Sequence, residues 1–310
     1  MYMWKQCPKA WSFSYVDGLK KKSSAKVFFE VGLYFHELVH VYYQALQAGH
    51  HKPGSEFLIN YMNSRIRKDI ETVKSDSINI ISTVSKMLTS YVATWSPILD
   101  KNITVLGVEK NIQVPVTLPS GNEVILNCIT DLIYRLPDGS ITIRDHKTGQ
   151  ANSWNQQMMP LENQTLFNAV AYFLLTGEKP LRRQISFINS YDYKRKEPSL
   201  QERFASFVHV DNEKAFDNYT AELLKTLDRM VAETDPVRFY SKDCSKCQFN
   251  AICTQEIRGF ETASLIRSQY EKVERDYEVK LRFGRAESST STRENPANDA
   301  ANFTLRLNLP

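Results

Sequence analysis

Two aspartates and a lysine lie on either side of a tight turn in the middle of the chain. The stretch 127–149 reads N-C-I-T-D-L-I-Y-R-L-P-D-G-S-I-T-I-R-D-H-K-T-G, and the Pro-Asp-Gly at 137–139 is a strong turn signal between two β-branched runs. A three-residue loop pairs Asp131 with Asp145 and puts Lys147 on the same sheet face, because side chains alternate along a strand. A two-residue loop would point the two aspartates to opposite faces. We therefore predict the three-residue loop, which also matches the isoleucine pairs.

This pair of carboxylates has a clear chemical consequence. Two carboxylates about 5 Å apart on one sheet face repel each other and favour a cation between them. Their oxygen atoms suit Mg²⁺ or Mn²⁺. The ammonium of Lys147 would point into the same site, where it can polarise a metal-bound water or neutralise charge on a phosphate. A surface hairpin with solvated charges is the structural alternative, but the shared face and the flanking isoleucines favour a site.

The wider arrangement resembles the PD-(D/E)xK nuclease superfamily, in particular its RecB-like exonuclease branch. Asp131 is followed after the turn by D-H-K-T-G, which begins at Asp145. The chain also has G-L-Y-F-H at 32–36, which is similar to the Gly-x-x-x-His of an upstream helix in that branch. Glu109 lies on the strand before the hairpin, and Gln164 lies on a helix after the lysine strand, as is typical of the family.

The resemblance implies a role for each of these residues. His36, Asp131 and Asp145 would be the metal ligands. Lys147 would be the catalytic lysine, and Glu109 would support a second metal or the attacking water.

The helix after the lysine strand departs from the family pattern at one position. By resemblance, Gln164 would contact the substrate. The family motif is Gln-x-x-x-Tyr, whereas this chain has Asn168 at the tyrosine position and Tyr172 one turn later. The implied substrate contact of this helix therefore rests on Gln164.

Four of the five cysteines form a second candidate site. Cys244, Cys247 and Cys253 give C-x2-C-x5-C, which is one thiol short of a closed metal site. Cys7, in Cys-Pro, is the candidate fourth ligand. Cys128 lies mid-strand, where a buried apolar thiol is expected. The spacing C-x2-C is typical of zinc sites, and thiolate softness allows zinc or an iron–sulfur cluster.

The order of these cysteines resembles an iron–sulfur subgroup of the RecB-like nucleases. In that subgroup one upstream and three downstream cysteines hold a [4Fe–4S] cluster. The resemblance places iron–sulfur ahead of zinc. The cluster would tie Cys7 to residues more than 230 positions away in the sequence.

The same upstream helix also carries a motif that is typical of a different enzyme class. His36-Glu37-Leu38-Val39-His40 is a literal H-E-x-x-H, which in zinc metalloproteases supplies two ligands and a general base. No metzincin extension follows it. The protease hypothesis leaves Asp131, Asp145, Lys147 and the cysteines unexplained, so the nuclease hypothesis is preferred.

The periodicity around these residues predicts the elements that must position them. Helical spacing, β-branched alternation and turn residues indicate a mixed α/β core that follows an N-terminal helical arm. The resemblance implies a restriction-endonuclease-like sheet flanked by helices. The expected elements are helices at 27–47, 55–95, 156–176 (closed by Gly177) and 213–233, strands at 103–116, 123–135, 140–147 and 181–191, and a cysteine loop at 244–253 followed by a polar helix to about 283.

These elements suggest four consecutive regions. Residues 1–100 would form an arm and helical region, 101–240 the nuclease core, and 241–284 the cysteine region. The Ser/Thr/Asn/Pro-rich stretch 285–310 is expected to be disordered, although its apolar end at 303–309 could contact a protein partner.

Composition sets the remaining limits. The chain has 310 residues, 42% hydrophobic and 24% charged, which is globular usage. Its net charge of +4 is too small to indicate a nucleic-acid partner by itself, so any basic surface must be local. No membrane span and no secretory signal are expected, which suggests the cytoplasm, or the host cytoplasm for a phage protein.

The combined prediction is a metal-dependent DNA nuclease. It would act as an exonuclease on single-stranded ends in DNA recombination, repair or phage DNA metabolism, with Mg²⁺ or Mn²⁺ and a [4Fe–4S] cluster. The alternative outside the enzymes is an inactive DNA-binding subunit of the same fold.

Overall fold

The structure is a computed structural model that describes residues 2–22, 27–49, 77–96, 102–149, 154–189 and 204–273, with 57, 58, 60, 61, 64, 100, 306 and 307. The chain forms two compact units, each assembled from separate stretches of sequence. The first unit contains residues 1–24, 113–127 and 220–310, and the second contains 25–112 and 128–219. The units are described separately below.

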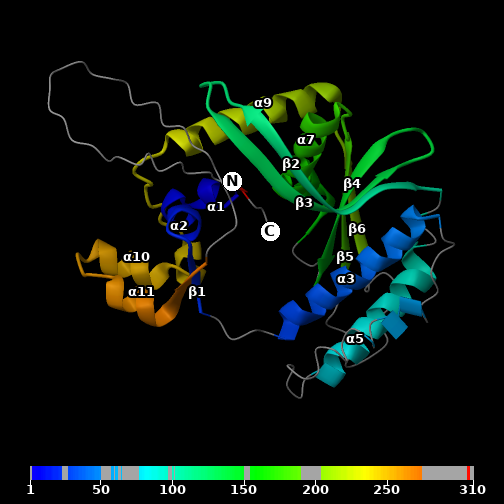
Figure 1. Ribbon diagram of the computed structural model, residues 1–310, viewed down its shortest axis with the longest axis horizontal. Coiled ribbons are helices and arrows are strands. Elements are labelled where there is room, and N and C mark those ends of the chain that lie inside the picture. Colours follow the sequence, from blue (N-terminus) through cyan, green and yellow to red (C-terminus); the bar gives the residue numbers. More distant parts are fainter. Residues whose placement is uncertain are drawn as a thin grey trace, which may run out of the picture. The chain divides into compact units, whose positions relative to one another are not determined.

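A mixed sheet is the central element of the fold (Figure 1), and its strand order is β2-β3-β4-β5-β6. β3 and β4 are antiparallel, β4 and β5 are parallel, and β5 and β6 are antiparallel. This arrangement, flanked by helices, is the expected α/β, restriction-endonuclease-like fold. The strands are β2 (Thr104–Thr117), β3 (Glu123–Arg135), β4 (Ile141–Thr148), β5 (Arg182–Ile188) and β6 (Phe204–Val210).

The turn between β3 and β4 has the predicted length. Leu136 N donates to Ser140 O at 2.9 Å and Gly139 N donates to Leu136 O at 2.9 Å, which closes a loop over residues 137–139. Gly139 has a φ of 87°, in the left-handed region that favours glycine. The ladder runs from Arg135–Ile141 to Leu132–Arg144, so Asp131 and Asp145 directly follow its last pair.

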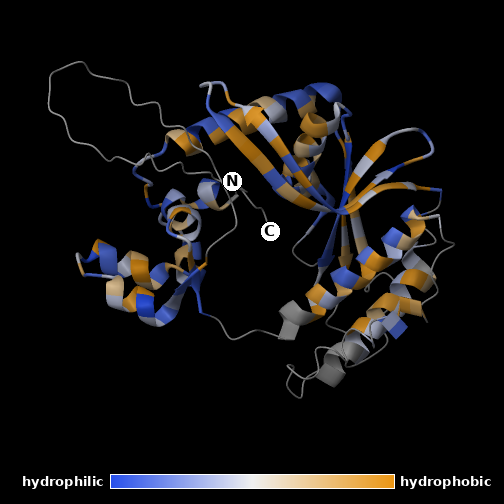
Figure 2. Cartoon of the chain, in the orientation of Figure 1, coloured by the Kyte–Doolittle hydropathy of each residue, from blue (hydrophilic) through white to orange (hydrophobic). Residues whose placement is uncertain are grey.

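Helices cover both faces of this sheet in the second unit. On one face α3 (Val27–Gln47) packs against α5 (Ser77–Ser90), which continues into a π-helical turn at Tyr91–Trp95. On the other face α7 (Asn163–Thr176) contacts β4 and β5 and ends at Gly177, as predicted, with a φ of 79°. Apolar and hydrophilic stretches alternate along α3 (Figure 2), as expected for a helix with one buried face.

Three sequence-based expectations differ from the structure. The helix expected at 156–176 is interrupted, because Glu162 is extended and separates a 3₁₀ turn at Gln156–Leu161 from α7. Strand β6 was not predicted, because its residues alternate only weakly between buried and exposed and form a strand by pairing with β5. The polar helix expected up to residue 283 ends earlier, because α11 (Ala263–Gln269) gives way to strand β7 (Tyr270–Lys272). The parts of the predictions that cover 274–305, 308–310 and most of 55–76 lie outside the described residues.

In the first unit, an early and a late stretch of the chain, residues 2–22 and 242–273, are joined through β-pairing and a small core. β1 (Leu19–Lys21) pairs antiparallel with β7, and Leu19 lies opposite Lys272. Phe13, Leu19, Phe249, Ile252 and Tyr270 form the buried cluster between them. The unit also contains α1 (Tyr2–Gln6), α2 (Pro8–Trp11), a π-helical turn at Ser12–Val16, a 3₁₀ turn at Lys242–Lys246, α10 (Asn250–Ile257), part of α9 (Glu213–Ala232), and β8 (Arg306–Leu307) beside β3.

None of the helices in the part of the chain that the structure describes is both long enough and apolar enough to cross a membrane.

A buried ion pair ties β5 to the residue after β6, and its removal should be costly. Arg183 Nε lies 2.6 Å from Asp211 Oδ2, and neither side chain is more than 7% exposed. Asp211→Ala would leave a buried guanidinium without its carboxylate, so we expect the free energy of unfolding to fall by about 3–5 kcal/mol. The matched control is Asp217→Ala, because Asp217 forms a half-exposed pair with Lys179 that should contribute at most about 1 kcal/mol. Equal losses in urea denaturation would contradict this ranking.

Candidate active site

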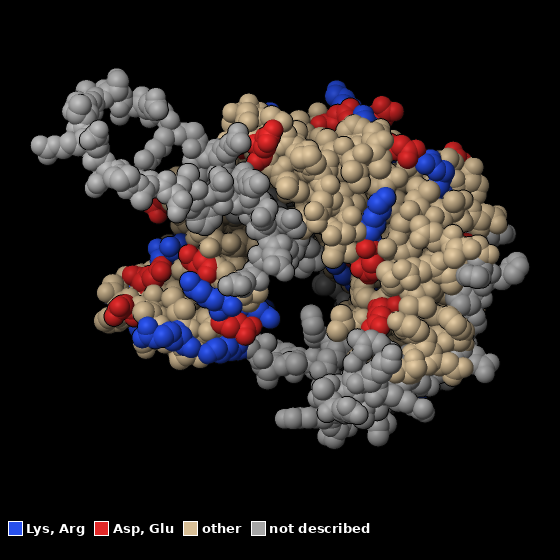
Figure 3. Space-filling view, viewed as in Figure 1, with Lys and Arg blue, Asp and Glu red and all other residues tan. Residues whose placement is uncertain are grey.

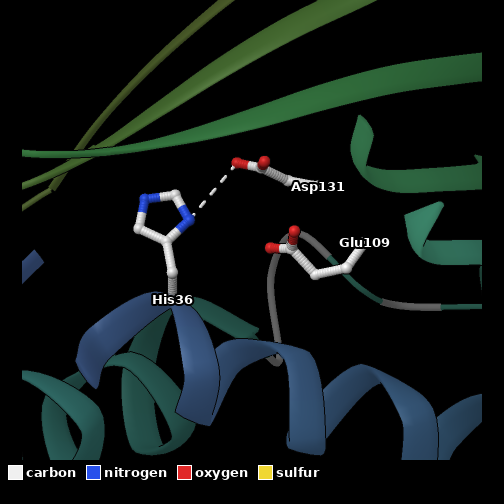
Figure 4. Close-up of side chains that lie close together, drawn as sticks. All are labelled: His36, Glu109 and Asp131. Carbon is white, nitrogen blue, oxygen red and sulfur yellow. Dashed lines mark ion pairs between the residues drawn. The ribbon is translucent and has the colours of Figure 1, made fainter. Parts of the chain in front are cut away.

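Three potential metal ligands from three different elements of the second unit converge at one point. The ligand atoms of His36 on α3, Glu109 on β2 and Asp131 on β3 all lie within 4.8 Å of one another (Figure 4). His36 Nδ1 is 3.6 Å from Asp131 Oδ2. One imidazole nitrogen and two carboxylates form a donor set suited to Mg²⁺ or Mn²⁺, with the imidazole favouring Mn²⁺. Among the described residues no other group of three His, Cys, Asp or Glu side chains is this close.

Gly32 lets α3 bring His36 close to the end of β4. A Cβ atom at Gly32 would lie 2.9 Å from Thr148 Oγ1, closer than real Cβ contacts allow. His36 follows one turn later on the same helix, so the close approach of α3 also positions the imidazole. This gives a physical reason for glycine in the Gly-x-x-x-His motif.

The contact between Gly32 and Thr148 leads to a prediction with an internal control. Gly→Ala inside a helix ordinarily stabilises by up to about 1 kcal/mol, but here the added methyl should push α3 away and cost about 1–3 kcal/mol. Gly32→Ala should also weaken Mn²⁺ binding, because His36 moves with the helix. Adding Thr148→Ala removes the clash and should restore both stability and binding. Calorimetry and thermal denaturation of the single and double variants test this, and additive losses would contradict it.

Glu109 reaches the site from an unusual backbone conformation. Its φ is 44°, in the left-handed region that costs a non-glycine residue of order 1 kcal/mol or more. The residue lies inside β2, where a regular strand would keep its side chain in alternation. The left-handed backbone redirects the carboxylate toward His36 and Asp131.

Asp131 lies where an isolated negative charge is unfavourable. Burial is the main reason why the pKa of its carboxyl is raised to about 7; a hydrogen bond from the backbone of His146 opposes the rise, and the nearby Glu109 carboxylate adds to it. That backbone N–H donates to Asp131 Oδ2 at 2.7 Å. Burial likewise raises the pKa of Glu109. A divalent cation would relieve this accumulation of buried carboxylates.

Asp145, Lys147 and Gln164 form a second, adjoining arrangement. Lys147 Nζ lies 2.9 Å from Asp145 Oδ2 and donates to Gln164 Oε1 at 2.6 Å. The pKa of Asp145 is raised to about 7, mainly by burial and then by the charge of Asp131, while Lys147 opposes the rise. The lysine side chain keeps 34% of its surface exposed, so its ammonium is held from two sides and remains reachable.

Local contacts at the start of α7 hold Gln164 in place. Glu162 caps the helix by accepting hydrogen bonds from the backbone N–H groups of Gln164 and Thr165 at 2.8 and 2.7 Å. One turn later Asn168 Nδ2 donates to Ile129 O at 3.4 Å. Asn168 therefore links α7 to β3.

The two histidines at the site differ in depth, and burial favours the neutral form of both. Burial lowers the pKa of His36, which keeps its imidazole available as a metal ligand. His146 is completely buried, and its pKa is far below the usual value because of desolvation and the neighbouring Arg144. Sequence reasoning did not single out His146, although it stands between Asp145 and Lys147.

The remaining residues of the H-E-x-x-H stretch are not part of this group. Glu37 accepts a hydrogen bond from Tyr61 at 3.2 Å, and burial lowers the pKa of the half-buried His40. Among the described residues, the ligand atoms that gather around His36 come from Glu109 and Asp131. The geometry therefore places His36 in the carboxylate centre.

The four candidate cluster cysteines line one cavity in the first unit. Its volume is about 700 Å³, and all four residues are partly buried at its wall: Cys7, Cys244, Cys247 and Cys253. Burial raises the pKa of Cys247, and the other three thiols add to the rise. The fifth cysteine, Cys128, is 2% exposed, which confirms the expected buried thiol.

Comparison with known proteins identifies the class of this chain. The sequence profile of the PD-(D/E)XK nuclease superfamily matches residues 4–254, a stretch that includes every candidate site residue above. The chain therefore belongs to the PD-(D/E)XK nuclease superfamily. Membership implies a metal-dependent nuclease, a hydrolase that uses divalent metals such as Mg²⁺ and acts on DNA.

The other two comparisons add little. A search of curated proteins finds no significant match. Among solved structures, the crystal structure of SSO0001 is similar at 15% identity and a TM-score of 0.34, over 64% of this chain and 94% of that one.

Proposed function

We propose that this nuclease is a RecB-like exonuclease that hydrolyses DNA from single-stranded ends. The observation that carries the proposal is the convergence of His36, Glu109 and Asp131 beside a lysine held between Asp145 and Gln164. The donor set fits a divalent metal, and the partly exposed ammonium of Lys147 adjoins it. An inactive DNA-binding subunit would not need this combination.

Each residue has a distinct task in the proposed reaction. His36, Asp131 and Glu109 would hold the metal, with Asp145 completing the negative charge around it. The metal would supply Lewis-acid polarisation of the scissile phosphate and a lowered pKa for a bound water. Lys147 would orient the attacking water and stabilise the charge that develops on the phosphate. Gln164 would hold the Lys147 ammonium in place as well as approach the substrate.

Exposed side chains beside the metal ligands support a single-stranded substrate. Leu33, three residues before His36 on α3, is 58% exposed, and Ile129, two residues before Asp131 on β3, is 52% exposed. Large apolar side chains beside a phosphate-cutting centre suit unpaired bases, whose faces are free to pack. Separately, in the first unit Lys20, Lys21 and Lys22 are exposed, and Figure 3 shows basic side chains along the lower edge of that unit.

An end-labelling assay tests the proposal. DNA labelled separately at each end, in single- and double-stranded form, should release mononucleotides or short oligonucleotides from one end in the presence of Mn²⁺, and EDTA should stop the release. Circular single-stranded DNA is the matched substrate without ends and should persist. Cleavage of the circle would replace the exonuclease with an endonuclease. No cleavage of any substrate would favour the inactive subunit.

We further propose that the four cysteines hold a [4Fe–4S] cluster that staples the two ends of the first unit together. All four cysteines line one cavity, and their order along the chain, one upstream and three downstream, supports the iron–sulfur cluster. Zinc is the alternative outcome of the test below.

The cluster proposal predicts a coloured protein. Anaerobically purified protein should be brown from thiolate-to-iron charge transfer and should contain iron and sulfide. Serine at Cys7, Cys244, Cys247 or Cys253 should remove the colour and lower the thermal midpoint, because metal-site binding energy contributes to folding. Cys128→Ser is the matched control and should stay brown. A colourless protein with stoichiometric zinc would contradict the cluster.

A further inference from the structure

A chain of buried polar side chains runs behind the metal ligands in the second unit. Tyr43 O–H donates to Asp100 Oδ2 at 2.8 Å, and Arg144 Nη1 donates both to the Tyr43 oxygen at 2.8 Å and to Asp100 Oδ1 at 2.9 Å. The Tyr43 and Tyr91 oxygens are 2.5 Å apart, and the Tyr91 oxygen is 3.4 Å from His146 Nε2. None of these residues is more than 4% exposed.

The charge at the far end of this chain sets the direction of every hydrogen bond in it. Asp100 is paired with the Arg144 guanidinium and offers only hydrogen-bond acceptors. Tyr43 therefore donates its only hydroxyl proton to Asp100. In the contact between the two tyrosines, Tyr91 must therefore be the donor.

The same assignment of donors and acceptors extends from Tyr91 to the imidazole of His146. With its proton directed at Tyr43, the Tyr91 oxygen can only accept from His146 Nε2. A neutral imidazole carries one proton, so Nδ1 of His146 is left as a lone pair. The buried network thus selects one tautomer.

This lone pair faces the metal ligands. His146 Nδ1 lies 3.9 Å from Asp131 Oδ2, the same oxygen that is 3.6 Å from His36 Nδ1. It is buried and has no hydrogen-bond partner among the described residues. The acceptors His146 Nδ1 and Asp131 Oδ2 face each other and need a hydrogen-bond donor nearby. Buried polar atoms without a protein partner usually bond to water.

We propose that His146 is a positioning residue whose Nδ1 accepts a hydrogen bond from a water of the metal centre, and that the Asp100–Tyr43–Tyr91 chain holds it in that tautomer. The inference rests on the proposed metal centre. Groups that bind the outer side of a metal site typically change its affinity 10–100-fold when removed. His146 would thus influence metal binding without touching the metal or the substrate.

Mn²⁺ binding to the full-length chain, measured by calorimetry, tests this role. His146→Phe keeps an aromatic ring but removes the acceptor, and Mn²⁺ binding should weaken roughly tenfold or more. Tyr91→Phe should weaken it less, and should have no further effect in the His146→Phe background, because Tyr91 acts through His146. Tyr42→Phe is the matched control: its hydroxyl is equally buried on α3 but bonds Ser96, so Mn²⁺ affinity should not change.

A spectroscopic readout keeps the test independent of the folding of His146→Phe. In protein labelled with ¹⁵N at its six histidines, the imidazole shifts report which nitrogen carries the proton. His146 should be the Nε2–H form in the parent protein, and Tyr91→Phe should mix the two forms. An Nδ1–H form in the parent would overturn the inference.

The remaining outcomes separate this inference from the proposed function. A lower thermal midpoint for His146→Phe with unchanged Mn²⁺ affinity would mean a purely structural role and would overturn the inference. Mn²⁺ binding with the expected dependence on His146 and Tyr91, in a protein that cleaves no DNA, would support the inference and overturn only the proposed nuclease activity.

Discussion

Replacing Lys147 by alanine should slow DNA cleavage by a factor on the order of 10² or more. Lys147 Nζ is held between Asp145 Oδ2 at 2.9 Å and Gln164 Oε1 at 2.6 Å, and its ammonium is the cation that these contacts aim at the site. Without it, the charge that develops on the phosphate loses a preorganised partner. Single-turnover cleavage of end-labelled DNA measures the effect directly, and thermal denaturation confirms that the variant is folded.

The matched control for this variant lies on the neighbouring helix. Glu37 follows the proposed metal ligand His36 but points elsewhere, toward Tyr61, because adjacent residues on a helix face different directions. Glu37→Gln should therefore keep most of the DNA cleavage. A zinc metalloprotease predicts the reverse, with Glu37→Gln abolishing peptide hydrolysis and Lys147→Ala silent. Full DNA cleavage by a folded Lys147→Ala protein would refute the proposed mechanism.

Mn²⁺ should bind far more tightly at about pH 8 than at about pH 6, by roughly tenfold for each carboxylate that must lose a proton. Burial raises the pKa of both Asp131 and Asp145 to about 7. Below that pH the metal competes with protons for the same oxygens, and above it the carboxylates are already ionised. Calorimetry across this range, with the proton release measured in two buffers, checks the prediction.

The same pKa shifts reverse the usual pH dependence of stability in the metal-free protein. A carboxyl whose folded pKa lies above its unfolded value stabilises the fold at low pH and loses that contribution as pH rises through the folded pKa. The thermal midpoint without metal should therefore fall between about pH 5 and about pH 8, and Mn²⁺ should restore it most at the higher pH. Asp131→Asn should flatten this dependence. A flat profile in the parent protein would contradict the raised pKa values.

The sequence by itself was sufficient for features that depend on local chemistry. The Pro-Asp-Gly turn and the alternation of side chains predicted the three-residue loop and the register of β3 with β4, which the backbone hydrogen bonds confirm. The limits of α3 and the end of α7 at Gly177 were also predicted correctly. Helical periodicity and a terminal glycine in the left-handed conformation depend only on residues close together in the sequence.

Other features were decided only by long-range contacts. No sequence signal near Glu109 predicts the left-handed backbone conformation that turns its carboxylate toward His36 and Asp131. Strand β6 has a weak pattern of its own and exists through pairing with β5. Such features depend on partners far away in the sequence, and no local propensity encodes those partners.

The buried chain behind the site shows the same division most clearly. From the sequence, the histidine between Asp145 and Lys147 is a spacer, while Tyr43, Tyr91 and Asp100 are unremarkable helix and loop residues. The fold buries them together, and only there does the ion pair of Asp100 with Arg144 set the direction of the hydrogen bonds. Residue types and spacing indicated which side chains could do chemistry. Burial and the distances between those side chains, which only the tertiary structure sets, determine which protonation state of each is favoured.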